Sequence, residues 1–384
     1  MFLVDTMTKL IKLDKDSTIK ITSKIEEYLT PDYVYIPLPP KKEDLKKEIN
    51  IKKGSLLYKN KFSPISGKLV KLDSYLIPNG KEVNCLVIEN DFQEKSERNV
   101  ATRKKINNLS KEEILESLFN TDLKSKLIRE DVTTLIISGM DDEPYIENEA
   151  FLQRENTKAI VDAIDALLNI FPNCKAYIAL KNTDSETILA YQNILGMYKN
   201  IEIKLVDDLY LIGKEVFLTK YLHIKDNYIY LKASEIYEIF LNLKKRKPLL
   251  EKYITISGNG VKNPCIIKTR EGVKVVEIFR KFFNEDLSNC AFYVNGIMQG
   301  TKLDINKLIV TTNLYGIIVM KKQKRDIKKC IKCGKCISIC PIHSNPLMAY
   351  KLGMKVKCIE CGLCTYICPS YIPLQKYLSG DEHE

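Results

Sequence analysis

The sequence predicts a multidomain protein of the α/β plus β class, and three observations support this. The chain has 384 residues, which is longer than one domain usually is. Short β-prone runs fill 31–95 and return at 251–320, whereas strand and helix patterns alternate between 109 and 248. Eight of the 12 cysteines are crowded between Cys330 and Cys368. We therefore expect three or four domains, the last of which is built around cysteines.

The N-terminal part is predicted to be a small all-β domain that follows an unassigned segment. Residues 1–30 are rich in lysine and too weakly patterned to assign. From 31 to 95, β-prone runs at 33–36, 54–57, 63–70 and 85–88 alternate with glycine and proline turns. The polar, charged stretch 91–108 then predicts a linker.

Residues 109–248 are predicted to form an α/β layer. Ser110 and Glu113 make a capping box that opens a helix. Apolar residues recur at helical spacing from 160 to 171, and Pro172 ends that pattern. Strands are expected at 133–137, 176–180 and 201–206, with another helix at 186–197. Because strands alternate with helices, we expect a parallel sheet.

The C-terminal third divides into a β-rich module and a cysteine domain. Residues 251–320 carry short strands, the first at 254–258, and one helix near 273–283. Residues 321–384 contain the crowded cysteines. Polar residues interrupt the apolar stretch 305–320, and nothing approaches the roughly 20 apolar residues that a membrane-spanning helix needs. Asp5 interrupts any signal peptide. We therefore expect a chain on the cytosolic side that does not cross a bilayer.

The strongest chemical signal is a repeated cysteine pattern, Cys-x-x-Cys-x-x-Cys-x-x-x-Cys-Pro, which begins at Cys330 and again at Cys358. This is the spacing of bacterial two-cluster ferredoxins, in which the fourth cysteine of each run ligates the other cluster. The pattern predicts one [4Fe–4S] cluster on Cys330, Cys333, Cys336 and Cys368, and a second on Cys358, Cys361, Cys364 and Cys340. Two structural zinc sites are the alternative, since zinc also takes four cysteines. Two complete copies with their prolines favour iron–sulfur.

Two clusters without an evident nucleophile indicate electron transfer rather than group transfer. Gly334 and Gly362 would let the backbone approach each cluster and direct N–H groups at sulfur. The net charge of +11 is concentrated in 321–357, which holds eleven Lys or Arg and one Asp. This segment is expected to steer an acidic redox partner or to face anionic lipid. The alternative is an ordinary solvated surface. Its leading cations are Lys321, Lys322, Lys324, Arg325, Lys328, Lys329, Lys332 and Lys335.

The residues also carry a family resemblance. The cysteine domain, with Asn345-Pro346-Leu347-Met348 and a terminal Ile372-Pro373-Leu374, resembles the C-terminus of the RnfC family, the C subunits of Rnf-type ion-translocating electron transport complexes. The stretch 63–68 is similar to that family's barrel-sandwich (lipoyl-like) domain, 136–145 to the acidic turn of its FMN- and NADH-binding domain, and 255–264 to its SLBB-like β-grasp module. The order and length agree over about 31–378. The resemblance implies these three domains at 31–95, 109–248 and 251–320, followed by a ferredoxin-type domain at 321–384.

One departure from the family bears on cofactors. The family's glycine-rich loop, Gly-x-Gly-Gly-Ala-Gly-Phe-Pro-Thr, cradles FMN and NADH phosphates with backbone N–H groups. The corresponding stretch here, 118–126, contains no glycine. A second family element, Gly-Gly-Glu-Lys, is reduced to 211–215, and Glu-Cys-Glu-Pro has become Asp141-Asp142-Glu143-Pro144. These changes put FMN and NADH binding in doubt, and we interpret Asp141, Asp142 and Glu143 as a solvated acidic loop.

The remaining candidates are given ordinary roles. Cys85, Cys174, Cys265 and Cys290 share no metal spacing and are expected to be buried small hydrophobes. His223, His343 and His383 are isolated and are interpreted as incidental surface residues. Lys68 lacks the Met-Lys-Met context of a lipoyl acceptor. The 21 tyrosines form no compact nucleic-acid motif.

The sequence therefore predicts an electron-transfer subunit of an Rnf-like membrane-associated oxidoreductase complex, with two [4Fe–4S] clusters and no catalytic residue or NADH site of its own. It would associate peripherally with the cytoplasmic side of the cell membrane, through other redox or membrane subunits, with ferredoxin or flavodoxin as candidate carriers. One alternative is a soluble adaptor for a dedicated reductase of the proline reductase or cobalamin reductase type. Another is a flavoprotein that oxidises NADH through a rebuilt site.

Overall fold

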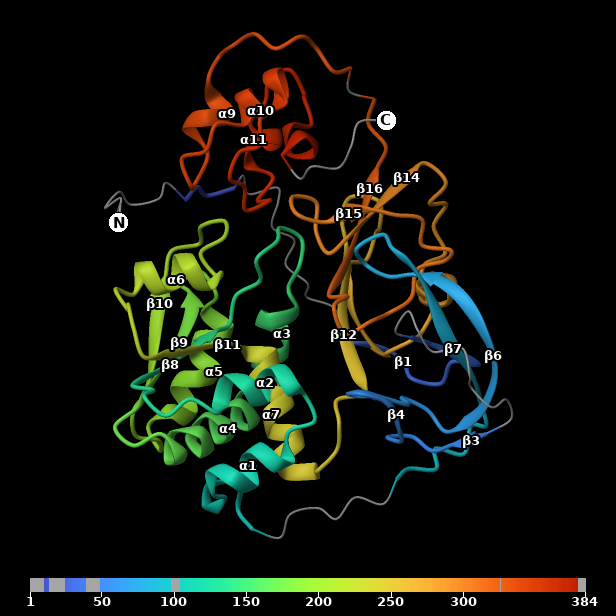
Figure 1. The fold of residues 1–384 in the computed structure, drawn as a ribbon, viewed down its shortest axis with the longest axis vertical. Coiled ribbons are helices and arrows are strands. Elements are labelled where there is room, and N and C mark those ends of the chain that lie inside the picture. Colours follow the sequence, from blue (N-terminus) through green and yellow to red (C-terminus); the bar gives the residue numbers. More distant parts are fainter. Residues whose placement is uncertain (1–9, 14–24, 39–48, 98–103, 325, 379–384) are drawn as a thin grey trace.

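The computed structural model describes residues 10–13, 25–38, 49–97, 104–324 and 326–378. Within these residues the strands form a six-stranded sheet, two four-stranded sheets and one two-stranded sheet. In Figure 1 the parallel sheet and its helices lie at the left, the other sheets lie at the right, and the cysteine-rich part caps the top. The mixed α/β architecture confirms the class predicted from the sequence.

The parallel sheet forms the centre of the α/β part. Its strand order is β10-β9-β8-β11, and every neighbouring pair is parallel. Its strands are β8 (Thr134–Ser138), β9 (Lys175–Lys181), β10 (Ile201–Val206) and β11 (Tyr228–Lys232). The first three confirm the sequence prediction to within one residue at each end, whereas β11 was not predicted. Strands β9 and β10 lie on one side of β8, and β11 lies on its other side. The strand order therefore reverses between β8 and β11.

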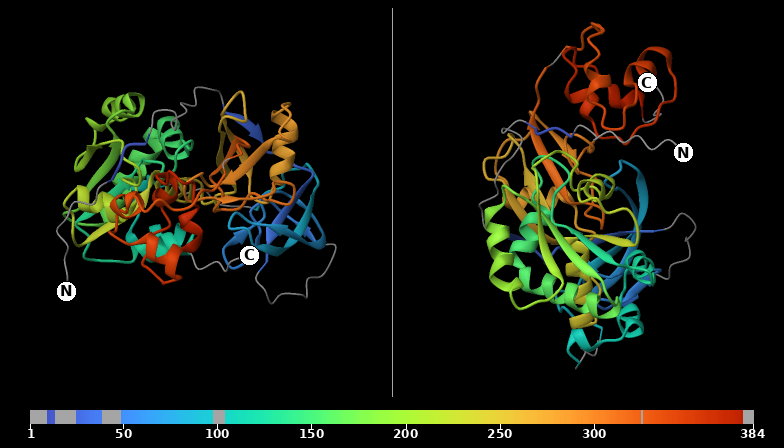
Figure 2. Two further views of the ribbon diagram at one scale, coloured as in Figure 1. Left: turned by 90° about the horizontal axis from the view of Figure 1, so that it is seen from above. Right: turned by 90° about the vertical axis from the view of Figure 1, so that its left-hand side faces the viewer.

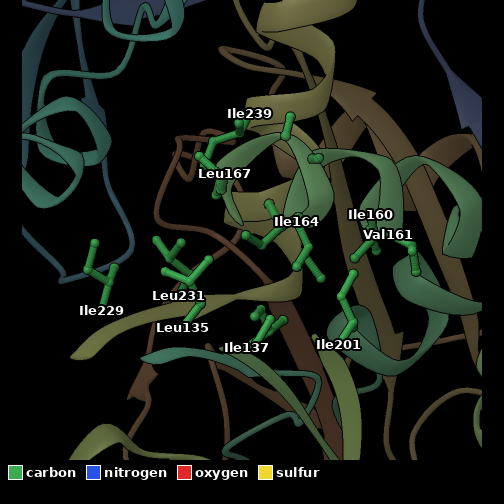
Figure 3. Close-up of a cluster of buried hydrophobic side chains, with 14 of the residues drawn as sticks. Leu135, Ile137, Ile160, Val161, Ile164, Leu167, Ile201, Ile229, Leu231 and Ile239 are labelled. Carbon is green, nitrogen blue, oxygen red and sulfur yellow. The ribbon is translucent and has the colours of Figure 1, made fainter. Parts of the chain in front are cut away.

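Helices cover the parallel sheet unequally. The capping box at Ser110 is present, with the Glu113 amide donating to the Ser110 hydroxyl, and it opens α1. One face packs against α1 (Lys111–Ser117), α2 (Thr121–Leu127), α4 (Thr157–Ile170), α5 (Ser185–Leu195) and α7 (Ala233–Lys245). Figure 3 shows Leu135 and Ile137 of β8 directed toward Ile164 of α4. Ile136, one residue out of phase, faces the other side with α6 (Glu215–Tyr221).

The remaining sheets share one core. The six-stranded sheet has the order β1-β13-β12-β16-β14-β15 and contains β1 (Glu26–Tyr28), β12 (Glu251–Ser257), β13 (Cys265–Arg270), β14 (Cys290–Val294), β15 (Thr301–Lys302) and β16 (Gly316–Lys321), with helix α8 (Val275–Phe282). The antiparallel sheet contains β2 (Tyr33–Pro37), β7 (Glu82–Asn90), β6 (Gly67–Leu76) and β3 (Asn50–Ile51), with the hairpin β4 (Leu56–Tyr58) and β5 (Lys61–Phe62) beside it. Ile36 and Ile88 of the second sheet pack in one cluster with Ile256 and Ile317 of the first.

Two local features join these parts. β1 pairs in parallel with β13, so part of the unassigned N-terminal segment completes the six-stranded sheet. Gly272 has φ of +85°, and its carbonyl accepts a hydrogen bond of 2.9 Å from the amide of Tyr35. A Cβ at Gly272 would lie 2.8 Å from the Tyr35 nitrogen, so only glycine allows this approach.

The cysteine-rich part is small and built from short helices. These are α9 (Lys335–Ser338), α10 (Pro346–Leu352), α11 (Leu363–Tyr366) and the 3₁₀ turn η3 (Leu374–Tyr377). Figure 2 shows that this part sits as a separate lobe at one end of the molecule. Helix α3 (Asn148–Glu155) joins the α/β part to β12, with the Thr255 hydroxyl donating to Asn148 over 2.7 Å. In the part of the chain that the structure describes, no helix has the length and apolarity to span a membrane.

Candidate metal centres

The eight clustered cysteines line two separate hollows, and each hollow combines both sequence runs. One is lined by Cys330, Cys333, Cys336 and Cys368, and the other by Cys358, Cys361, Cys364 and Cys340. With their open mouths, the hollows hold about 370 Å³ and 350 Å³ of empty space. We call them the outer hollow and the inner hollow. Among the described residues, no group of three or more Cys, His, Asp or Glu has the geometry of a single-ion site. The four thiols of each set line one common hollow, which is the grouping that a Cys₄-ligated cluster uses.

The two runs have the same backbone geometry, 28 residues apart. Gly334 and Gly362 both have φ of +74°, and they precede α9 and α11. Lys332 and Glu360 both adopt positive φ, and their amides donate to Cys330 Sγ over 3.4 Å and Cys358 Sγ over 3.2 Å. In both runs the donor to the thiol sulfur is a backbone amide rather than a side chain. Hydrogen bonds from backbone amides to sulfur stabilise the reduced form of a cluster.

The inner hollow is docked against the rest of the molecule. Leu363, whose side chain is fully buried, packs with Tyr210, Phe217 and Met298. The Tyr210 hydroxyl donates to the Cys361 carbonyl over 2.8 Å. A Cβ at Gly362 would lie 2.3 Å from the Met298 carbonyl oxygen, so the close approach depends on glycine.

The outer hollow faces solvent. Cys333 is the one exposed thiol among the eight cluster-pattern cysteines, all of which are described. A Cβ at Gly334 would meet no atom within 4 Å. Ile331 and Lys332 beside it are exposed, as is Lys335, which also lines the hollow. The two hollows thus have similar walls but different surroundings.

Glu143 organises the surface on which the inner run docks. It is 5% exposed and accepts hydrogen bonds from the amides of Met298 and Gln299, at 3.0 and 3.1 Å, and it shares the proton of the Tyr210 hydroxyl, 3.1 Å away, with the Cys361 carbonyl. Burial raises the pKa of Glu143 to about 7, although these donors oppose the shift. The interpretation of this residue as part of a solvated loop is wrong, because its carboxylate joins the α/β part to the loop at 298–299.

Asp141 and Asp142 are half-buried and are held by contacts with other segments. Asp141 accepts from the amides of Glu149 and Ala150 at the start of α3, at 3.0 and 3.3 Å. Burial raises its pKa to about 7, with Glu149 adding to the effect. Asp142 forms an ion pair of 2.8 Å with Lys232. Tertiary contacts therefore override the loop composition that suggested a solvated turn.

A wide cavity opens beside these carboxylates, where the strand order of the parallel sheet reverses. It has about 2120 Å³ of space, including its open mouth, and is lined by residues of the α/β part and of the β part. The edge between β8 and β11 is where an α/β sheet usually binds its ligand. The space is ample for a flavin, so the surrounding chemistry decides whether one fits.

The residues of this cavity do not fit a flavin phosphate. A helix N-terminus can bind an anion through its free backbone amides. At the helices that border this cavity, those amides already donate hydrogen bonds to side-chain oxygens of the protein. Asn120 accepts from the amides of α2, Asp141 from those of α3, and Glu149 from the Ser234 amide of α7 at 2.8 Å. The stretch 118–126, where the family has its glycine-rich loop, contains most of α2.

The charge of the cavity points the same way. Its three lysines are Lys61, which pairs with Glu271, Lys232, which pairs with Asp142, and Lys252, whose pKa burial lowers. Against them stand eight carboxylates: Asp122, Asp141, Asp142, Glu149, Glu235, Glu238, Glu251 and Glu271. A phosphate dianion would meet net repulsion from this lining, so these residues do not fit a flavin phosphate.

The other sequence candidates lie where they were expected, as far as the structure describes them. Cys85, Cys174, Cys265 and Cys290 are buried. His223 and His343 are exposed, and His383 lies outside the described residues, as does Arg325. Tyr210, Met298 and Gln299 were not singled out, because their role arises only when distant segments meet.

The α/β part and the cysteine-rich part each match a known protein family. Residues 115–234 match the Nuo51 FMN-binding domain, and residues 300–378 match the 4Fe-4S dicluster domain. The chain therefore combines the fold of an FMN-binding domain with an iron–sulfur domain. The match at 300–378 covers all eight cysteines and supports iron–sulfur clusters.

The relatives among characterised proteins are named as C subunits of ion-translocating complexes. The chain is 25% identical to the C subunit of the ion-translocating oxidoreductase complex of Rhodobacter capsulatus, over 79% of this chain and 65% of that protein. It is 24% identical to the C subunit of the proton-translocating ferredoxin:NAD(+) oxidoreductase complex of Clostridium ljungdahlii, over 88% and 83%. It is 21% identical to the C subunit of the Na(+)-translocating ferredoxin:NAD(+) oxidoreductase complex of Acetobacterium woodii, over 74% and 70%.

These names confirm the resemblance to the RnfC family that the sequence motifs indicated. The chain spans just under two thirds of the length of the Rhodobacter relative. Among solved structures, an NAD+-reducing [NiFe]-hydrogenase in the air-oxidised state is similar, with a TM-score of 0.47 and 14% identity over 60% of this chain and 48% of that chain.

Proposed function

We propose that this chain is an electron-transfer subunit of an Rnf-like, membrane-associated oxidoreductase complex. Electrons would pass one at a time through two [4Fe–4S] clusters, without an NADH site in this chain. The observation that carries the proposal is the crossed pairing of the cysteines, since each hollow takes three thiols from one run and its fourth from the other.

The two hollows support the ligand sets that we propose. Cys330, Cys333, Cys336 and Cys368 would hold the outer cluster, and Cys358, Cys361, Cys364 and Cys340 the inner cluster. Bound clusters would supply one-electron carriers. The chain's own part is to fix the thiols, direct the amides of Lys332 and Glu360 at sulfur, and bury the inner site against Tyr210 and Met298.

The domain assignment extends this proposal. We assign 31–95 to a barrel-sandwich domain, 109–248 to an FMN-binding-type domain without the phosphate site, 251–320 to an SLBB-like β-grasp module and 321–384 to the ferredoxin-type domain. The helix α8 against the sheet of β12, β13, β14 and β16 supports the β-grasp assignment. In this arrangement the α/β domain acts as the platform on which the inner cluster is seated.

The subunit would act on the cytoplasmic side of the cell membrane, held there by membrane-embedded partner subunits. The relatives' names, as C subunits of ion-translocating complexes, support this location and this assembly. Copurification with integral membrane subunits tests it, and a chain that purifies only by itself from gently solubilised membranes would argue against it.

The cluster content is tested by anaerobic purification and chemical analysis. Two Cys₄-ligated cubanes predict about eight iron and eight sulfide per chain. Electron paramagnetic resonance of the reduced protein should show two interacting [4Fe–4S] centres. Near four iron, or zinc in place of iron, would overturn the assignment.

The absence of a flavin site is tested separately on iron-replete protein. Titration with FMN, followed by fluorescence or calorimetry, should show no stoichiometric binding, because the cavity presents carboxylates where phosphate would lie. NADH-dependent dye reduction should also be absent. Stoichiometric FMN together with NADH turnover would restore the flavoenzyme alternative.

A further inference from the structure

The surface around the outer hollow combines charge, apolar side chains and access to a thiol. We call it the outer face and define it as Ile327, Lys328, Lys329, Ile331, Lys332, Cys333 and Lys335, all of which are exposed. Ile327 and Ile331 are 64% and 67% exposed. Ile331, Lys332 and Lys335 line the hollow itself, so the apolar and basic groups adjoin the predicted cluster directly.

The corresponding positions of the inner run show that this composition is not required by the cysteine motif. Lys332 corresponds to Glu360, and Lys335 corresponds to Leu363, which is fully buried against Tyr210 and Met298. The same loop geometry thus carries a docked apolar residue in one copy and an exposed cation in the other. The inner run has its partner within the chain, whereas the outer run presents its equivalent surface to solvent.

The chemistry of the outer face selects one kind of partner. A basic rim attracts an acidic surface over several ångströms, and exposed apolar side chains at the centre favour close contact once the surfaces meet. The face surrounds Cys333, the exposed thiol of the set. A protein that carries a redox group can exchange an electron there, whereas a lipid surface offers no acceptor.

We propose that the outer face is the docking site for an acidic, one-electron carrier protein, a proposal that rests on the two-cluster function above. One electron leaves the reduced outer centre, which returns to its oxidised form, and the carrier's redox group gains that electron. Lys328, Lys329, Lys332 and Lys335 steer the carrier, Ile331 forms the apolar contact beside the centre, and Ile327 adds a second exposed apolar side chain.

The first test measures binding with both proteins oxidised, so that no electron is transferred. Flavodoxin, an acidic flavin protein, serves as the probe for iron-replete chain in a calorimetric titration at low ionic strength. Changing Lys328, Lys329, Lys332 and Lys335 together to Glu should weaken binding about tenfold or more, and binding by the unaltered chain should fall steeply with salt.

A matched control separates the effect of the outer face on binding from the effect of the protein's net charge. Lys175, Lys199, Lys225 and Lys244 are exposed lysines of the α/β domain, far in sequence from the eight cluster cysteines, which begin at Cys330. Changing these four to Glu alters the net charge equally and should change the affinity by less than about threefold. Ile331→Gln in the unaltered background should weaken binding without changing its salt dependence. Equal losses in the two quadruple variants would overturn the proposal.

The second test measures the rate of electron transfer from the outer centre to the carrier. Holo protein reduced by a viologen radical is mixed with oxidised flavodoxin, and formation of the flavin semiquinone is followed by stopped flow. The outer-face variant should react about ten to a hundred times more slowly at low salt, while the viologen, supplied in excess, still reduces both of its clusters. Unchanged transfer to flavodoxin would contradict the proposal. Failure of the viologen to reduce two clusters would instead contradict the two-cluster function.

Anionic lipid is the competing occupant, and vesicles distinguish it. Holo protein is sedimented with vesicles that contain phosphatidylserine, using the same two quadruple variants. The docking proposal predicts weak vesicle binding that the outer-face change leaves within about threefold of the control. Strong vesicle binding that is lost in the outer-face variant, with flavodoxin exchange unaffected, would overturn the proposal and assign the face to the membrane.

Discussion

The two cysteine runs of the last domain share a motif and a backbone, yet they occupy different environments. Both runs turn through a glycine with φ of +74° and direct an amide at the first thiol of the run. The inner run then buries Leu363 and Cys361 against the body of the protein, whereas the outer run exposes Lys335 and Cys333. The short cysteine motif therefore specifies the type of cluster. The residues between the cysteines determine whether that cluster lies against the body of the protein or faces solvent.

The largest expected effect comes from replacing the fourth cysteine of either run, because that cysteine lines the hollow of the other run. Cys340→Ser lies within the outer run but should damage the inner cluster, because its thiol lines the inner hollow. Cys368→Ser should damage the outer cluster. Each change should remove roughly half of the iron or convert one centre to a three-iron form, read by iron analysis and electron paramagnetic resonance. Loss of the cluster nearest in sequence would contradict the pairing.

The two glycines provide the next test. Gly334→Ala and Gly362→Ala each place a side chain at positive φ, which costs about 1–2 kcal/mol. Gly362→Ala also forces a Cβ to within 2.3 Å of the Met298 carbonyl, whereas Gly334→Ala meets no atom. The total cost at Gly362 should reach roughly 2–5 kcal/mol. The temperature at which cluster absorbance is lost should fall well below that of the unaltered chain for Gly362→Ala and only slightly for Gly334→Ala. Equal effects would show that the inner run is not docked as described.

Sequence patterns predicted the α/β class and the two sets of cysteines that line the hollows, because both predictions depend on local spacing. The strands β8, β9 and β10 follow runs of apolar residues, and Ser110 with Glu113 forms the helix start that its motif predicts. The crossed cysteine sets follow from a ligand spacing that the chain cannot satisfy in many ways. The α/β layer and the dicluster domain were thus predictable from spacing, whereas the FMN-binding type of the layer was indicated only by the family resemblance.

The environment of the clusters was not predictable, because it depends on contacts between distant segments. Glu143 lies in a stretch with the composition of a solvated turn, yet Tyr210 and the 298–299 amides enclose it. β1 has three residues, too few for a periodic signal, and it is defined only by its pairing with β13. Nothing in the motif alone distinguishes the buried Leu363 from an exposed residue.

Protonation of Glu143 should affect the inner run and leave the outer run unchanged. Its folded pKa of about 7 lies above the usual carboxyl value near 4.3, so the folded state binds the proton more tightly. Stability of the contact is therefore highest below about pH 4.5, falls by up to about 1.4 kcal/mol per pH unit between about 4.5 and 7, and is constant above that window. Glu143→Gln should remove this contribution, while Asp141, whose pKa is raised in the same direction, keeps its own.

Hydrogen exchange at pH 5 and pH 7.5, corrected for intrinsic rates, measures this effect. The 296–300 and 358–366 amides of the unaltered chain should be less protected at the higher pH, and this difference should shrink in Glu143→Gln. The 330–338 amides serve as the internal reference and should not change. A pH dependence shared by both runs would mean that Glu143 does not act through the docked surface.

The smallest effect concerns the charge beside each first thiol. Lys332 and Glu360 occupy equivalent positions, both exposed, with φ of +56° and +55°. Lys332→Glu should lower the reduction potential of the outer cluster, and Glu360→Lys should raise that of the inner cluster. At such exposed positions the shift is on the order of 20 mV, because water screens the charge. Redox titration monitored by electron paramagnetic resonance, at low and high salt, resolves the two centres. Both shifts should diminish at high salt, whereas shifts that persist there would mean that the substitutions alter the amide hydrogen bonds to sulfur rather than the electrostatic field.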